Sequence, residues 1–129
     1  MCRALVVEDD PRVGGLLATI LQREQFEATV VRSAFEARAL LSADHFHLIV
    51  LDLAAPDYGW MVIEYIRQHR LSLLKSIVVI SANPALDRAA LNGEYPEPVC
   101  KFVLEPIDVR ELVDVVHACK AVCAAPDNG

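Results

Sequence analysis

Short runs of apolar residues alternate along this chain with longer segments in which apolar residues recur every three or four positions. The short runs are apolar throughout and lack the apolar–polar alternation of a strand with one solvated face. Strands of this kind are covered on both faces, which is typical of parallel sheets between two layers of helices. We expect the strands at residues 4–7, 28–31, 48–51, 77–80 and 102–104. The pattern therefore predicts an α/β fold with a doubly wound, five-stranded parallel sheet.

The periodic segments between the strands predict five helices, two of which begin with clear capping residues. Asp10 can cap the first helix, with Pro11 at its first position. Ser33 and Glu36 form a capping box for the second. The helices are expected to begin near residues 11, 34, 60, 84 and 108, with a loop at residues 54–59 before the third.

Carboxylates or a hydroxyl follow four of the predicted strands. These residues are Glu8 and Asp9 after the first strand, Asp52 after the third, Ser81 after the fourth and Glu105 after the fifth. In a parallel sheet the carboxyl ends of the strands meet at one edge, and ligands bind there, where the strand order reverses. The sequence therefore predicts an acidic pocket with one hydroxyl at that edge.

Such a pocket needs a proton or a cation. At about 5 Å and an effective dielectric constant of about 20, each pair of carboxylates costs about 3 kcal/mol. Oxygen ligands without histidine or cysteine favour Mg²⁺ or Mn²⁺ over zinc. An aspartate that faces such a metal and a hydroxyl donor is placed to accept a phosphoryl group. The simpler alternative, acids that only cap helices and face solvent, suits Asp10 and Asp57 better than Asp9 and Asp52.

The composition narrows the class of protein further. A chain of 129 residues suits one domain, which we place at residues 1–124, with a flexible tail at 125–129. The net charge of -6 and the aromatic content of 6% argue against nucleic-acid binding. No apolar stretch approaches the roughly 20 residues that span a bilayer, and we expect no signal peptide before the first strand. We therefore expect a cytoplasmic protein whose four cysteines are reduced.

Three motifs lie at the ends of the predicted strands, at residues 7–10, 51–53 and 80–82, and Pro56 and Gly59 follow the second. In this order and spacing they resemble the receiver domain of two-component response regulators, along nearly the whole chain. The resemblance implies a flavodoxin-like (β/α)5 fold with the strand order 2-1-3-4-5.

The resemblance also implies roles for the acidic residues. Asp52 would be the phosphoacceptor. Glu8 and Asp9 would hold Mg²⁺, or Mn²⁺, with help from Asp52 and the backbone carbonyl of Ala54. Because Ala54 is small, it would leave the acyl phosphate open to water, which suggests fast dephosphorylation.

The fifth strand contains the one departure from the family pattern. The resemblance implies that Ser81 bonds a phosphoryl oxygen and that Phe102 is the switching aromatic, together with Ser81. Glu105, however, stands where family members usually carry a lysine that reaches the phosphoryl oxygens. The change of two charge units amounts to several kcal/mol against a phosphoryl anion before screening, by the same Coulomb argument. Lys101 lies about 13 Å back along the strand and cannot easily substitute, which leaves Arg12 as the nearby candidate.

Three functions remain open at this point. The first, which we favour, is a single-domain response regulator that accepts a phosphoryl group on Asp52 and is not an enzyme beyond self-catalysed phosphorylation and dephosphorylation. The second is a divergent pseudo-receiver that acts through protein contacts without phosphorylation. The third is a phosphatase of the haloacid-dehalogenase type, which wants a second acid where this chain has Ala54.

Partners follow from the same resemblance. The phosphodonor would be a histidine kinase or a phosphotransfer protein. No output domain and no DNA-binding pattern follows the last helix, so we expect a downstream protein target and contact with neither nucleic acid nor membrane. In the family, the face made by the fourth helix, the fifth strand and the fifth helix binds partners or a second copy, so a homodimer through that face is a further expectation.

Overall fold

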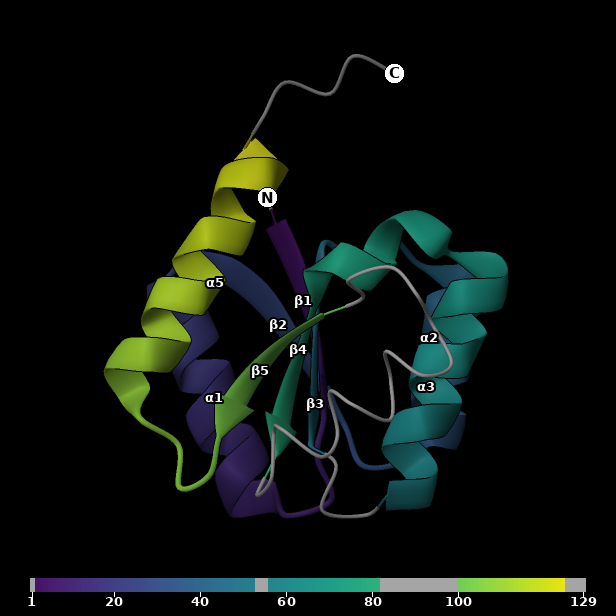
Figure 1. Cartoon of the computed structure of the whole chain (residues 1–129), viewed down its shortest axis with the longest axis horizontal. Coiled ribbons are helices and arrows are strands. Elements are labelled where there is room, and N and C mark those ends of the chain that lie inside the picture. Colours follow the sequence, from purple (N-terminus) through teal and green to yellow (C-terminus); the bar gives the residue numbers. More distant parts are fainter. Residues whose placement is uncertain (1, 53–55, 82–99, 125–129) are drawn as a thin grey trace.

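The five predicted strands form one parallel sheet. In the computed structural model, which describes residues 2–52, 56–81 and 100–124, the strands lie in the order β2-β1-β3-β4-β5 (Figure 1). All four neighbouring pairs are parallel. The strands have the bounds Cys2–Val7 (β1), Phe26–Val31 (β2), Leu48–Asp52 (β3), Ile77–Ser81 (β4) and Cys100–Leu104 (β5). The expected fold class and strand order are confirmed.

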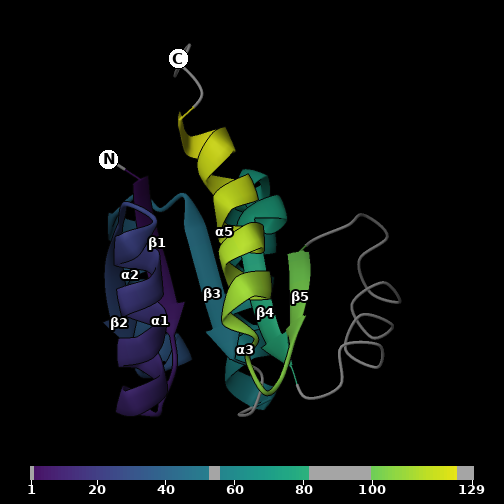
Figure 2. The ribbon, with the colours of Figure 1, turned by 90° about the vertical axis from the view of Figure 1, so that its left-hand side faces the viewer.

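Helices cover both faces of the sheet, as the apolar runs predicted. α1 and α5 lie on one face, which Figure 2 views directly, and α2 and α3 lie on the other (Figure 1). Alternate residues of a strand therefore enter two cores: Leu5 and Val7 of β1 face α2 and α3, whereas Ala4 and Val6 face α1 and α5. No helix in the described part of the chain is long and apolar enough to cross a membrane. The helices have the bounds Pro11–Arg23 (α1), Ala34–Ala43 (α2), Pro56–His69 (α3) and Val109–Ala124 (α5).

The register of the strands brings their carboxyl ends to one edge of the sheet. Val7 of β1 is level with Leu51 of β3, and Ser81 of β4 is level with Leu104 of β5. The residues that follow these positions therefore emerge side by side, which is the arrangement that the pocket requires.

The third helix begins earlier than predicted. It starts at Pro56 and not near residue 60, so the expected loop is wrong for residues 56–59. Proline fits the first position of a helix because the N–H that it lacks would have no partner there. A 3₁₀ helix, η1, follows at Leu71–Ser76 and was not predicted. The fourth helix, expected to begin near residue 84, lies outside the described residues.

The predicted caps of α1 and α2 are confirmed. The Asp10 carboxylate accepts a hydrogen bond from the backbone N–H of Arg12 at 2.9 Å. The Ser33 hydroxyl accepts one from the backbone N–H of Glu36 at 3.2 Å. Each cap gives a partner to an N–H that the helix itself leaves unsatisfied.

Gly14 allows α1 to lie close to the sheet. A Cβ at this position would stand 2.9 Å from Cγ1 of Val30 and 3.8 Å from the Cβ of Glu8. A Cβ at the neighbouring Gly15 would meet no atom within 4 Å. Of the two glycines, only Gly14 is therefore required by packing.

The cysteines differ from the prediction. Cys2 is disulfide-bonded, so the expectation of four reduced cysteines is wrong. Cys119 is a free, buried cysteine, and burial raises the pKa of its thiol. A disulfide needs two Cα atoms about 4.4–6.8 Å apart, and the spacing of cysteines along the sequence does not show such proximity.

Candidate functional site

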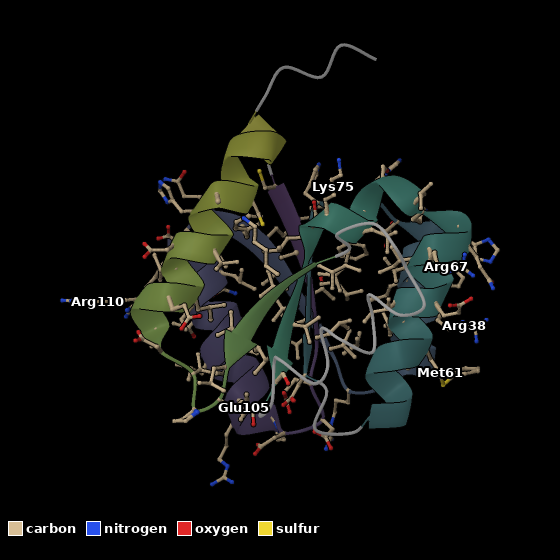
Figure 3. The ribbon with its side chains drawn as sticks, viewed as in Figure 1. Arg38, Met61, Arg67, Lys75, Glu105 and Arg110 are labelled. Atoms are coloured by element: carbon tan, nitrogen blue, oxygen red, sulfur yellow. The ribbon has the colours of Figure 1, made fainter. Side chains whose placement is uncertain are left out.

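The edge formed by the carboxyl ends of the strands carries the predicted acidic pocket. Glu8 follows β1, Asp52 is the last residue of β3, Ser81 is the last residue of β4 and Glu105 follows β5. Figure 3 shows Glu105 at this edge, next to the end of its strand. The sequence therefore placed these four residues correctly with respect to the sheet.

Glu8 is the most buried acid of the pocket, with 3% of its surface exposed. Its backbone N–H donates to the carbonyl of Val31 at 3.0 Å, which fixes it beside the end of β2. Its Oε1 accepts a hydrogen bond from the backbone N–H of Asp10 at 3.0 Å, whereas its Oε2 is buried without any hydrogen-bond partner. Burial, followed by the neighbouring Asp52 carboxyl, raises the pKa of Glu8 to about 8. Glu8 therefore holds a proton at neutral pH unless a cation replaces it.

Glu105 faces the pocket and not the solvent alone. Its backbone N–H donates to the carbonyl of Ser81 at 2.9 Å, so the residue stays beside the end of β4. The side chain is partly buried, and burial raises its pKa; the charge of Asp52 and a side-chain hydrogen bond to Asp52 raise it further. Glu105 and Asp52 are therefore direct neighbours.

Asp52 lies at the centre of this group. It is paired with Ile80 in the sheet and is partly exposed. Its charge raises the pKa of Glu8 on one side and of Glu105 on the other. A carboxyl group thus lies on each side of Asp52, which is the predicted phosphoacceptor.

Asp9 and Ser81 complete the rim and the wall of the pocket. Asp9 is exposed, and its side chain contributes to the raised pKa of Glu8, so it lies within reach of the same group. Ser81 is 2% exposed and closes the pocket on the side of β4. The two residues therefore differ in access: Asp9 is exposed to solvent, and Ser81 is buried.

The structure does not describe residue Ala54 or the side chain of Phe102, which are two of the predicted site residues. Ala54, whose carbonyl was expected to assist with a metal, belongs to residues 53–55. Phe102 is level with Val79 in the sheet, but its side chain is not among those described. Their expected roles stay predictions.

The candidate cations do not replace the missing lysine. Arg12 has a side chain that is 92% exposed and lies 3.6 Å from the Asp10 carboxylate. Lys101 is exposed and is level with Val78, well before the end of the strand. Neither guanidinium nor ammonium offsets the charge of Glu105 in this structure.

Sequence reasoning missed Arg32. This residue directly follows β2, and its Nη2 donates to the backbone carbonyl of Asp9 at 3.3 Å. The signal was available, because the end of β2 lies beside the end of β1 in the predicted strand order. Arg32 is thus a cation at the rim of the pocket, on the side opposite Glu105.

The donors of the pocket fit a divalent cation in chemistry. They are hard carboxylate oxygens, which suit magnesium and manganese, and the buried, unpartnered Oε2 of Glu8 lacks the positive partner that such a group needs. Within the described residues, however, no three acidic, histidine or cysteine side chains already surround a single point closely enough to hold a metal. The carboxyl groups would therefore have to turn toward a cation as Glu8 loses its proton.

Known proteins with similar sequences indicate the family of this chain. Residues 4–117 match the family described as the response regulator receiver domain. Protein PetR of Rhodobacter capsulatus is 40% identical over 134 residues, which cover 95% of this chain and 52% of PetR. Response regulator protein PilR of Pseudomonas aeruginosa is 31% identical over 115 residues, which cover 88% of this chain and 25% of PilR. The chain thus spans about a quarter to a half of these two relatives.

Solved structures show the same fold. The response regulator protein TrrA of Thermotoga maritima, in complex with Mg²⁺ and BeF, superposes with a TM-score of 0.77 at 26% sequence identity. The superposition covers 92% of this chain and 99% of TrrA. TrrA thus binds Mg²⁺ and has a fold similar to that of this chain.

Proposed function

Because this chain belongs to the response regulator receiver domain family of two-component signalling, we propose that it accepts a phosphoryl group on Asp52 and signals through contacts with other proteins. The observation that carries the proposal is the position of Asp52 at the end of β3, between Glu8 and Glu105. Receiver domains of response regulators interact with histidine kinases or phosphotransfer proteins, and we propose such a protein as the donor. The chain would act as a phosphoacceptor and not as an enzyme toward other substrates.

Each residue of the pocket has a specific part in this proposal. An oxygen of Asp52 attacks the phosphorus atom of the donor and forms an acyl phosphate as the donor group leaves. The buried hydroxyl of Ser81 donates a hydrogen bond to a phosphoryl oxygen. Glu8 and Asp9, with Asp52, would hold Mg²⁺ or Mn²⁺. When bound, this ion neutralises carboxylate charge and orients the phosphoryl oxygens.

Glu105 opposes the same reaction. It places a carboxyl group against Asp52, where the incoming phosphoryl group brings further negative charge. We expect phosphorylation to be slow for this reason and to depend strongly on the divalent cation.

The contact between Glu105 and Asp52 also favours a second function. If the repulsion between Glu105 and the phosphoryl group dominates, the domain would work as a pseudo-receiver that binds partners without phosphorylation. The buried, unpartnered oxygen of Glu8 favours the first function, because a pocket without a cation leaves that oxygen unsatisfied.

Intact-mass spectrometry tests the proposed function. The chain is incubated with acetyl phosphate and Mg²⁺, and its mass is followed with time. We expect a gain of one phosphoryl group in the original chain and in an Asp114→Asn control, which alters an exposed aspartate on α5, and no gain in Asp52→Asn. A chain that gains no mass, although calorimetry shows that it binds Mg²⁺, would support the pseudo-receiver.

A further inference from the structure

A groove lies between α2 and α3, on the face of the sheet opposite α1 and α5. It has a volume of about 290 Å³ and is lined by Phe35, Arg38, Ala39 and Ser42 of α2 and by Tyr65 of α3. The four positions on α2 follow the spacing i, i+3, i+4 and i+7, so they form one face of that helix. The groove therefore runs along α2 and is bounded by two helices.

Large apolar side chains are exposed beside this groove. Phe35 is 79% exposed and Met61 is 43% exposed. Met61 lies one turn before Tyr65 on α3, and its side chain points outward from that helix (Figure 3). Burial of an exposed phenylalanine or methionine contributes about 1.5–3 kcal/mol each. Exposed apolar side chains that gather beside a groove mark a site of protein interaction.

The groove also presents a positive charge that has no acidic partner among the described residues. The guanidinium carbon of Arg38 lies 5.4 Å from the centre of the Tyr65 ring, so the side chain lies over the aromatic wall. Arg67, two residues after Tyr65 on α3, is instead paired with Glu64 at 2.8 Å. Of these two arginines, only Arg38 is available to a carboxylate of another molecule.

We infer that this groove binds an amphipathic helix of a partner protein, with apolar residues one turn apart and an acidic residue opposite Arg38. A partner helix that lies between α2 and α3 would bury its apolar face. Its apolar residues at i, i+3 or i+4 and i+7 would contact Phe35, Met61 and Tyr65. The charge of Arg38 selects an acidic helix over a basic one.

The groove is short, because five residues line it, so a helix of a few turns is enough to fill it. Phe35 lies in the first turn of α2, directly after the end of β2. The groove thus begins at the edge of the sheet that carries the acidic pocket. Binding of a helix in the groove does not depend on phosphorylation of Asp52.

Two synthetic peptides test the inference. Both are helical and carry leucines at i, i+4 and i+7; one carries glutamates on the flank of the apolar face, and the other carries lysines at the same positions. Binding to the ¹⁵N-labelled chain is measured by titration of amide chemical shifts. We expect the acidic peptide to bind at least tenfold more tightly than the basic one, with shifts confined to α2 and α3.

Variants of exposed residues locate the contact. Phe35→Ala should weaken binding of the acidic peptide about tenfold, and Arg38→Glu should reverse the preference between the two peptides. Leu16→Ala, which alters a 48% exposed leucine of α1 on the opposite face, should change nothing. Thermal melts check that each variant is folded. Shifts that map outside α2 and α3, equal affinity for both peptides, or dimerisation that Phe35→Ala abolishes would each overturn the inference.

Discussion

Glu105 gives the sharpest prediction, because its charge should affect phosphorylation and metal binding in opposite directions. Glu105→Gln removes one negative charge beside Asp52, and Glu105→Lys reverses that charge. The negative charge repels an incoming phosphoryl group but attracts a divalent cation. Both substitutions should therefore speed phosphorylation of Asp52 and weaken the binding of Mg²⁺.

The size of the effect follows from the contact. A charge on Glu105 and a charge at Asp52 that lie about 5 Å apart interact with about 3 kcal/mol at an effective dielectric constant of about 20. Water at this partly exposed position reduces the value to about 1.4 kcal/mol, which is a factor of about ten in rate or affinity. We therefore expect about tenfold for Glu105→Gln and about a hundredfold for Glu105→Lys.

The assay combines two measurements on the same variants. The rate constant for phosphorylation by acetyl phosphate is taken from the time course of intact mass, and the dissociation constant of Mg²⁺ is taken from isothermal titration calorimetry. Glu27→Lys is the matched control, because it makes the same change in net charge at an exposed position near the start of β2. If Glu105→Lys changes both quantities no more than Glu27→Lys does, the Coulomb argument is refuted.

Three further predictions concern stability. Glu8 keeps its proton up to about pH 8 in the folded chain but only up to about pH 4.5 in the unfolded chain. Without divalent cations, the free energy of unfolding should therefore fall by a few kcal/mol as the pH rises between these two values. Urea titrations at several pH values measure this change. Gly15→Ala should raise the free energy of unfolding by about 0.5–1 kcal/mol. Gly14→Ala should be about 1–2 kcal/mol less stable than Gly15→Ala, because the added Cβ would meet Val30. Ser33→Ala should lower it by about 1 kcal/mol through loss of the cap on α2.

Each of these has an outcome that would contradict it. A Glu8→Gln variant should lose most of the pH dependence, and an unchanged slope would assign that dependence to another group. Equal stability of the two alanine variants would show that α1 can shift away from Val30. A Ser33→Ala variant as stable as the original chain would mean that water satisfies the N–H of Glu36 equally well.

The apolar runs were sufficient to predict the fold because they report burial on both faces. Leu5 and Val7 enter one core and Ala4 and Val6 the other, which is typical of a parallel sheet between two layers of helices. The start of α3 was missed because proline and glycine are common both in turns and in the first turn of a helix. Local residue types could not decide between the two.

The site was predicted in position but not in detail. The residues that follow parallel strands must meet at one edge, so Glu8, Asp52, Ser81 and Glu105 could be placed from the sequence. The direction of the Glu105 side chain, toward Asp52, depends on packing that the sequence does not display. The groove beside Arg38 likewise exists only because α2 and α3 pack side by side. The disulfide of Cys2 requires a second cysteine close in space, which the sequence does not show.

The central claim is that Asp52 accepts a phosphoryl group in a pocket that holds a divalent cation. A crystal structure of the chain with Mg²⁺ and beryllofluoride, which imitates a phosphoryl group, tests it most directly. We expect beryllofluoride joined to an Asp52 oxygen, with the Ser81 hydroxyl in contact, Mg²⁺ held by Glu8, Asp9 and Asp52, and Glu105 turned away from Asp52. A structure with Mg²⁺ bound, no beryllofluoride on Asp52 and Glu105 still against that residue would contradict it.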